Sequence, residues 1–331
     1  MERAIGLFAD KVRSTFRPEV ISDIGAFGGL FAFDAARYQQ PVLVASTDGV
    51  GTKSLISQSM GIHNTIGYDL VAHCTNDVAV TGAEPLFFLD CITVEKVVEE
   101  TIAEIVEGMV VACKEAGCAL IGGEIAEHPG HLTAGTYDLS GTCIGVVERE
   151  GIIDGSTIAR GDVVVGIESS GLQTNGYSMA RKVLLEDMGH LLGDQPNELR
   201  GSIGEELLRP SILYSPALGD LTQSVRVNAM AHITGGGIQG NLSRVIPDGL
   251  QAVIQREAWE VPPIFRLIQG LGNVDEDEMF HVFNMGIGLV ALISPDDANK
   301  ALDLIRARGH RAHEIGLISD AESKDSKVRI L

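Results

Sequence analysis

The sequence has little that would tie it to a membrane or to a nucleic acid. No run of 18 apolar residues occurs, and the first twenty residues mix acidic and basic side chains. Neither a membrane span nor a signal peptide is therefore expected. Basic residues are few, since 25 Lys and Arg stand against 45 Asp and Glu, giving a net charge of −20. Such a charge repels nucleic-acid backbones and anionic membrane surfaces.

Cysteine and aromatic residues are also scarce. The five cysteines are an odd number and form no CxxC pair. Four of them lie in apolar or small-residue surroundings, which predicts buried free thiols in a reduced, cytoplasmic protein. Aromatic residues make up 5% of the chain, yet apolar residues make up 45%, enough for ordinary buried cores. Glycine is abundant, with 39 residues and no fibrous repeat, which predicts tight turns and close backbone approaches.

The length of 331 residues favours two domains. In the first half, short β-branched runs alternate with longer segments in which apolar residues recur at helical spacing. This alternation predicts an α/β or layered α+β fold. Strands are expected at residues 41–47, 86–93, 118–121 and 142–147, and helices at residues 65–82 and 97–117.

A polar, glycine-bearing segment at residues 148–162 is the expected boundary between the two domains. We therefore expect an N-terminal domain at residues 1–160 and a C-terminal α/β domain at residues 161–331. In the second domain, strands are expected at residues 163–167 and 279–294, and helices at residues 177–188, 238–245 and 298–308.

The first candidate site is the segment DGVGTK at residues 48–53, which directly follows a predicted strand. Gly49 and Gly51 allow a ligand to approach the backbone closely, and Lys53 supplies a positive charge. Asp48 is suited to hold a divalent cation, so the combination fits a nucleoside triphosphate with magnesium. The residue order is not that of a Walker A loop. A plain polar turn between a strand and a helix is the alternative interpretation.

The second candidate site is a polar stripe on the helix that follows. At 100° per residue, Asp69, His73, Asn76 and Asp77 fall within about 100° of the helix surface. A solvated surface usually carries Lys, Glu and Gln, whereas Asp and Asn are poor helix formers. The stripe therefore favours a side that faces a metal ion and substrate over a solvated face. His73 by itself is equally consistent with a hydrogen-bonded structural histidine.

A third cluster, Gly122-Gly123-Glu124, comes at the end of another predicted strand. Glycines beside a carboxylate at this place are typical of ligand loops in α/β folds. Glu127 and His128 follow, but adjacent loop residues are weak signs of a zinc site, so zinc is disfavoured.

Two further clusters lie in the second half. Residues 169–178, which include Asn175, are rich in hydroxyl and amide groups. His232 is followed by Thr234 and by three glycines at residues 235–237, ahead of a helical pattern. Free N–H groups at a helix start favour phosphate, although a flexible turn is the simpler interpretation of a glycine triplet alone.

Taken together, six motifs resemble one known family. They occur in this order: DGVGTK (48–53), TIGYDLVAHCTNDV (65–78), GAEPLFFLD (82–90), ALIGGE (119–124), HITGGG (232–237) and FNMGIG (283–288). This series closely resembles the phosphoribosylformylglycinamidine cyclo-ligases, or AIR synthetases, of purine biosynthesis. The resemblance extends from about Arg17 to Ile318, nearly the whole chain.

The resemblance implies a fold and a reaction. It implies two α/β domains and a homodimer in which the N-terminal halves of two subunits pair through their sheets. The implied reaction is the ATP- and Mg²⁺-dependent closure of formylglycinamidine ribonucleotide to 5-aminoimidazole ribonucleotide, with release of ADP and phosphate. Phosphoryl transfer of this kind needs positioning and charge neutralisation more than a protein nucleophile.

The resemblance also implies roles for the residues in the motifs. Asp48, Asp77 and Glu124 would hold Mg²⁺, and Lys53 and Thr52 would contact ATP phosphates, with Lys53 also counted as catalytic. Asn175 and the 235–237 turn would hold phosphate or ribose groups at the domain interface, with Asn175 also counted as catalytic. His232, the third residue counted as catalytic, would contact the reacting centre as acid, base or oxyanion donor. The full set expected to bind ATP or substrate phosphate is Asp48, Gly49, Gly51, Thr52, Lys53, Asp69, Asn76, Gly235, Gly236 and Gly237.

Some departures from the family pattern keep an alternative open. Gln173 and Thr174 stand where the family usually has His and Ser, and the family usually begins with a longer segment. These departures favour a non-catalytic nucleotide-binding relative as the alternative function. Thiamine-monophosphate kinase, selenophosphate synthetase and the carbamoyl-dehydrating hydrogenase-maturation protein are disfavoured, because the cysteines or motifs that they need are missing.

Overall fold

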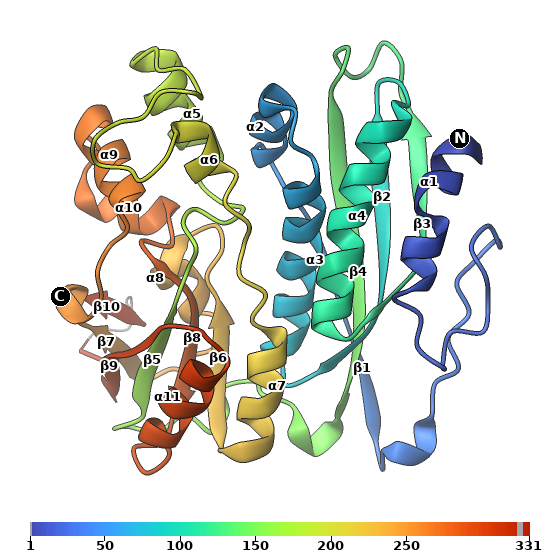
Figure 1. Cartoon of the computed structure of the whole chain (residues 1–331). Coiled ribbons are helices and arrows are strands. Elements are labelled where there is room, and N and C mark those ends of the chain that lie inside the picture. Colours follow the sequence, from blue (N-terminus) through green and yellow to red (C-terminus); the bar gives the residue numbers. More distant parts are fainter. Residues whose placement is uncertain (1, 323–326) are drawn as a thin grey trace. The chain divides into compact units, whose positions relative to one another are not determined.

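The computed structural model describes residues 2–322 and 327–331, and these form two compact units (Figure 1). Unit 1 comprises Met1–Ala79 and Ala83–Gly151, and unit 2 comprises Val80–Gly82 and Ile152–Leu331. Each unit combines one sheet with helices, which confirms the predicted α/β class. Among the helices in those ranges, none has both the length and the apolar composition needed to cross a membrane.

Unit 1 is built on a four-stranded sheet of order β1-β4-β2-β3. Strand β4 runs antiparallel to β1 and β2, whereas β2 and β3 are parallel and are joined through α4. The strands are β1 (Pro41–Gly49), β2 (Glu84–Val94), β3 (Ala119–Glu127) and β4 (Tyr137–Glu148). The helices are α1 (Glu2–Arg13), α2 (Lys53–Met60), α3 (Asn64–Ala79) and α4 (Glu99–Ala116).

Two glycines let α3 and α4 pack with their backbones in contact. A Cβ atom added to Gly67 of α3 would overlap the carbonyl oxygen of Ile105, and one added to Gly108 of α4 would overlap the carbonyl oxygen of Asn64. No larger residue fits at either position without separating the helices. The helix pair that carries the predicted polar stripe is therefore held at a defined distance.

The two faces of the unit 1 sheet differ in burial. On the face toward α3 and α4, Phe88 and Ile92 are fully buried. On the opposite face, the Leu43 side chain is 64% exposed, and Leu89 and Cys91 are only partly buried. Because side chains alternate between faces along a strand, one face of this sheet is packed by helices while the other presents apolar residues to the surroundings.

Unit 2 contains a six-stranded sheet of order β10-β7-β9-β5-β8-β6. Strand β8 (Ile287–Ile293) is buried along its whole length, which makes it the centre of this core. The other strands are β5 (Val163–Glu168), β6 (Val227–His232), β7 (Leu250–Ile254), β9 (Ala312–Asp320) and β10 (Val328–Ile330). The helices are α5 (Tyr177–Arg181), α6 (Ile203–Leu207), α7 (Ser215–Ser224), α8 (Gly237–Leu242), α9 (Pro263–Gly272), α10 (Glu276–Val282) and α11 (Ala298–Ala307).

The strand predicted at residues 279–294 is correct only in its second part. Helix α10 occupies the first part, and β8 begins at Ile287. The Asp275 side chain accepts a hydrogen bond from the Asp277 backbone N–H and so caps the helix. Acidic residues in the first turn also interact favourably with the helix dipole. These capping signals outweigh the strand-like apolar pattern that follows them.

The predicted cysteine environment is confirmed. Cys74, Cys113, Cys118 and Cys143 are buried and free, and Cys91 is partly exposed and free. Burial raises the pKa of the Cys113 and Cys143 thiols. These thiols therefore behave as apolar core groups and not as nucleophiles.

The contact between α3 and α4 gives a first prediction. Gly108→Ala should lower the free energy of unfolding by about 2–4 kcal/mol, because the added methyl group overlaps the α3 backbone. The control is Gly219→Ala in α7, where an added Cβ meets nothing within 4 Å. That substitution should raise stability by about 0.5–1 kcal/mol through higher helix propensity. Urea unfolding of both variants measures the difference, and an equal effect would show that the helices do not touch at Gly108.

Candidate functional site

The end of β1 presents the Asp48 carboxylate at the surface of unit 1. Its Oδ1 accepts a hydrogen bond of 2.7 Å from the Gly49 backbone N–H. Its Oδ2 lies 2.8 Å from Nε2 of His73, and the side chain is 43% exposed. Asp48 is thus oriented by two donors while the carboxylate still reaches solvent. This is the state expected of a carboxylate that binds a cation.

The polar stripe of α3 packs against the protein and is not a solvated face. Asp69, His73 and Asn76 are buried, and Asp77 is partly buried. Asp77 Oδ2 accepts a hydrogen bond of 3.2 Å from Ser46 Oγ on β1. The stripe therefore faces the end of β1, where it brings the Asp77 carboxylate to the same side of the sheet as Asp48.

His73 is tied to the charge of Asp48. Burial by itself lowers the pKa of His73, but the hydrogen bond and the negative charge of Asp48 outweigh burial, so the pKa of His73 is raised. The protonated imidazole and the carboxylate stabilise one another. His73 therefore orients Asp48, a role that the sequence pattern alone left open.

Lys53 lies beneath the loop and not on its surface. Its Nζ is 2.7 Å from Asp69 Oδ2, and both side chains have 0% exposure. Burial lowers the pKa of Lys53, and the charge of Asp69 works against that effect. A buried ion pair of this kind joins the start of α2 to α3. In this structure, the Lys53 ammonium supports the loop from inside, which differs from the direct phosphate contact expected from the sequence.

Glu124 lies on the other face of the sheet from Asp48. The β2–β3 register pairs Cys91 with Glu124 and Asp90 with Gly123, and paired residues point to the same face. Glu124 is exposed and shares the open face with Cys91. Among the described residues, Asp48, Asp77 and Glu124 do not form a cluster whose oxygens lie within 4.8 Å of one another. The structure thus places two of the three predicted magnesium ligands, Asp48 and Asp77, on one side of the sheet and Glu124 on the other.

Asp90 is a titratable residue that the sequence reasoning did not select. It lies on the helix-packed face of β2, and a Cβ atom added to Gly123 would overlap its carboxyl group. Burial raises the pKa of Asp90 to about 7, and the charge of Glu124 adds to the effect. The signal for this residue was its place at the end of the apolar run LFFLD, where a carboxyl group must be at least partly buried.

In unit 2, the structure brings Asn175 beside the glycine turn. Asn175 Oδ1 lies 3.5 Å from the position that a Cβ of Gly235 would occupy. Asn241 fixes this turn, because its Nδ2 donates hydrogen bonds of 3.2 Å to the Gly235 carbonyl and 2.8 Å to the Gly237 carbonyl. The backbone of the turn is therefore ordered before any ligand binds.

His232 ends β6 directly ahead of the glycine turn. It is buried, and its ring meets the Tyr214 ring edge to face with 6.4 Å between the centroids. Tyr214 is itself fully buried and donates a hydrogen bond of 2.8 Å to the Glu168 carbonyl. The imidazole of His232 is thus held by packing against a fixed aromatic ring.

Gln173 has a structural place in unit 2. It is 3% exposed and adopts a φ of 61°, which residues other than glycine rarely do. Its Oε1 accepts a hydrogen bond of 3.0 Å from the Ile212 backbone N–H. The side chain therefore points into the core of unit 2 and fastens the loop that carries Asn175.

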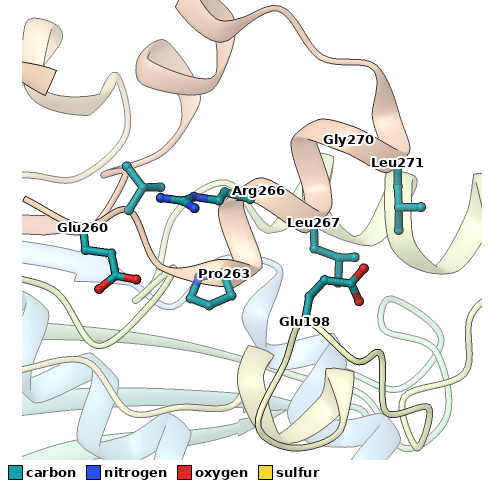
Figure 2. A pocket seen from close by; sticks show the side chains of 8 residues that line it. Glu198, Glu260, Pro263, Arg266, Leu267, Gly270 and Leu271 are labelled. Carbon is teal, nitrogen blue, oxygen red and sulfur yellow. The ribbon is translucent and has the colours of Figure 1, made fainter. Parts of the chain in front are cut away.

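A hollow of about 350 Å³ lies beside α9 in unit 2 (Figure 2). Figure 2 shows Glu260 at one end and Leu271 at the other, with Arg266 between them. None of the predicted site residues lines this hollow. The residues that line it are Glu198, Glu260, Val261, Pro263, Arg266, Leu267, Gly270 and Leu271.

The partly buried carboxyl of Asp90 gives a pH prediction. The unfolded carboxyl ionises near pH 3.8, whereas the folded one resists ionisation up to about pH 7. The contribution of Asp90 to stability is therefore greatest in acid and is lost as the pH rises from about 4 to about 7. Asp90→Asn should remove this loss. The free energy of unfolding of the variant minus that of the wild type should therefore be larger at pH 8 than at pH 4 by at least about 1.4 kcal/mol.

Urea unfolding at pH 4, 6 and 8 measures this effect. Asp138→Asn, which removes an exposed carboxyl from the neighbouring strand β4, is the control and should change stability little. A difference between wild type and Asp90→Asn that stays constant with pH would contradict the raised pKa.

Solved structures share this fold. Thiamine-monophosphate kinase from Stenotrophomonas maltophilia K279a matches with a TM-score of 0.69 at 18% identity, over 98% of this chain and 95% of that chain. The hydrogenase maturation protein HypE of E. coli matches with a TM-score of 0.67 at 20% identity, over 98% and 93%. A structure of HypE in complex with ATP matches with a TM-score of 0.68 at 19% identity, over 99% and 90%. Identities this low establish the fold alone.

Sequence relatives are much closer. The family descriptions "AIR synthase related protein, N-terminal domain" and "AIR synthase related protein, C-terminal domain" match residues 33–147 and 159–329. Phosphoribosylformylglycinamidine cyclo-ligase of Myxococcus xanthus is 48% identical over 95% of this chain and 91% of its own length. The enzyme of that name from Anaeromyxobacter sp. is 50% identical over 96% and 92%. With such identity over almost its whole length, the chain belongs to the phosphoribosylformylglycinamidine cyclo-ligase family, the AIR synthases.

Proposed function

We propose that this chain closes the imidazole ring of formylglycinamidine ribonucleotide, using ATP and releasing 5-aminoimidazole ribonucleotide, ADP and phosphate. The observation that carries the proposal is the 48–50% identity to cyclo-ligases over about 95% of the chain. The surface carboxylate of Asp48, oriented by His73, supplies the matching chemistry. A cytoplasmic location belongs to the proposal, because the five free cysteines suit a reducing compartment.

The chemistry makes a poor leaving group into a good one. The formyl oxygen of the substrate takes the terminal phosphoryl group as the bond from phosphorus to ADP breaks. The amidine nitrogen then attacks the formyl carbon. The bond between that carbon and the phosphorylated oxygen breaks, so phosphate leaves, and the nitrogen that has joined the ring loses a proton. The protein contributes charge neutralisation and orientation to these steps.

The carboxylates of unit 1 fit magnesium. Asp48 and Asp77 offer hard oxygen donors on one side of the sheet, and donors of this kind are the ligands that Mg²⁺ prefers. Mg²⁺ bound there would neutralise charge on the ATP phosphates. Gly49, Gly51 and Thr52 would meet those phosphates through the loop backbone. Beneath them, Lys53 and Asp69 would act on the phosphates through the loop that they support, and Asn76, buried on the same helix, would complete the binding set.

The residues of unit 2 fit the ribonucleotide. Asn175 and the backbone of Gly235 and Gly236 would offer an amide and N–H groups side by side to a phosphate or ribose group, while the Gly237 N–H donates to the Thr234 carbonyl and shapes the turn. His232 adjoins this turn and could take a proton from the attacking nitrogen or donate a hydrogen bond to the departing oxygen.

The proposed role of Glu124 requires a second subunit. It lies on the open face of the unit 1 sheet, where Leu43 is exposed to solvent. We infer that two copies pack these open faces together, which would bury the apolar residues. Because β1 is an edge strand of its sheet and Asp48 lies near its end, Glu124 would reach the Asp48 and Asp77 site of the partner subunit past that edge, a site that it does not join within its own chain.

The direct test measures phosphate release from ATP in the presence of formylglycinamidine ribonucleotide while the aminoimidazole product is followed. One phosphate per product molecule is expected. ATP binding without phosphate release would contradict the proposal and favour a non-catalytic nucleotide-binding protein. Phosphate release without product would indicate ATP hydrolysis uncoupled from ring closure and would also contradict the proposal.

The shared site gives a sharper prediction, which uses two variants with different affinity tags. Asp48→Asn and Glu124→Gln should each lower activity more than tenfold as homodimers, because each removes a magnesium ligand from both sites. Heterodimers of the two variants, purified through both tags, should recover about half of the wild-type activity, since one of their two sites keeps both carboxylates. Absence of recovery would place Glu124 and Asp48 in the same chain's site, and failure of the tags to co-purify would exclude a stable dimer.

A further inference from the structure

The side chain of Asn284 makes four buried hydrogen bonds in unit 2. Its Nδ2 donates to the Gly171 carbonyl at 2.8 Å and to the Leu172 carbonyl at 3.3 Å. Its Oδ1 accepts from Ser169 Oγ at 2.9 Å and from the Gly286 backbone N–H at 2.8 Å. The side chain is 4% exposed. The whole hydrogen-bonding capacity of the amide is thus used inside the protein.

These bonds converge on one loop. Ser169, Gly171 and Leu172 belong to the segment 169–176 between β5 and α5, which also carries Asn175. On its other side, the loop is fastened by Gln173, whose Oε1 accepts from the Ile212 backbone N–H at 3.0 Å. The loop needs both attachments, because the positive φ of Gln173 is unfavourable without tertiary support.

The end of α10 also sets how closely the loop and the glycine turn approach. A Cβ atom added to Gly176 would overlap the Phe283 ring, and one added to Gly237 would overlap the Phe280 carbonyl oxygen. The loop and the turn therefore both rest on the same helix end, immediately before Asn284. In this arrangement, Asn175 Oδ1 lies 3.5 Å from the position that a Cβ atom added to Gly235 would occupy.

We propose that Asn284 is a positioning residue for the ribonucleotide: it holds the 169–176 loop so that Asn175 faces the 235–237 turn. This inference rests on the function proposed above and adds to it a residue that acts through Asn175. Asn284 does not touch the ligand itself, because its donors and acceptors are occupied within the protein. Its effect is the preorganisation of a binding group.

The test compares two buried asparagines of unit 2. Asn284→Ala removes the amide that holds the loop. Asn228→Ala is the matched control, because Asn228 is 5% exposed and donates to Asp162 Oδ2 at 2.8 Å, away from the loop. Asn284→Ala should raise the KM for formylglycinamidine ribonucleotide at least tenfold and leave the KM for ATP within twofold. Asn228→Ala should leave both constants within twofold at a similar loss in Tm. Equal KM values in the two variants would overturn the proposal.

A double-mutant cycle separates positioning from a general structural effect. If Asn284 acts through Asn175, the variant with both Asn175→Ala and Asn284→Ala should have a KM no more than twice that of the worse single variant. Losses that multiply would show that the two residues act independently and would overturn the proposal.

Hydrogen exchange tests the positioning apart from the reaction. Amides of residues 171–176 should exchange at least tenfold faster in Asn284→Ala than in the wild type, and at the wild-type rate in Asn228→Ala. This result would support the positioning role even if the wild type failed to close the ring, a failure that would contradict only the proposed function. Unchanged exchange would overturn the inference. Should Asn284→Ala not fold, Ser169→Ala removes one hydrogen bond to Oδ1 and should raise exchange about threefold.

Discussion

The first unit depends on a charge pair from which water is excluded. Lys53 and Asp69 have no exposed surface, and their charged atoms are 2.7 Å apart. Each charge alone would be very costly to bury, so each requires the other, and losing one partner of such a pair costs about 3–5 kcal/mol. The pair joins the first residue of α2 to the middle of α3. The pair thereby anchors the segment that directly follows β1, the strand that presents Asp48 near its end.

A second charged contact turns this scaffold into a site. His73, one turn after Asp69 on α3, reaches back to Asp48 on β1 and orients its carboxylate. The buried pair and the His73–Asp48 pair thus lie along the same helix face, one inaccessible and one reaching solvent. The difference in exposure separates their roles, because only a carboxylate that reaches solvent can exchange bound water for a cation and for the nucleotide phosphates that bind this cation.

In the second unit, neutral side chains hold the proposed binding groups in place. Asn241 donates hydrogen bonds to carbonyl groups of the glycine turn, and Asn284 donates to carbonyl groups of the loop that carries Asn175. An amide both donates and accepts, so it can satisfy several backbone groups in a tight loop without the desolvation cost of an ion. Buried charges therefore position the carboxylates of the first unit, while buried amides position the proposed phosphate-binding groups of the second.

Local signals in the sequence predicted much of this arrangement. Segment length predicted α3 and helical spacing predicted α4, and the choice of Asp and Asn on α3 indicated a side that faces a metal ion and substrate and not a solvated face. The prediction failed at residues 279–294, where an apolar run suggested a strand although Asp275 caps a helix there. Nor could the pattern show that Gln173 turns inward, since this depends on the distant Ile212 N–H.

By itself, the sequence determined the fold class, the family and the set of polar residues, because these follow from the order and spacing of residues along the chain. Only the tertiary structure decided which of those residues meet. It buried Lys53 against Asp69, placed Glu124 on the face opposite Asp48, and gathered four hydrogen bonds on Asn284. The reason is physical: burial and the face of a sheet depend on contacts between residues far apart in the chain, and such contacts leave no local pattern.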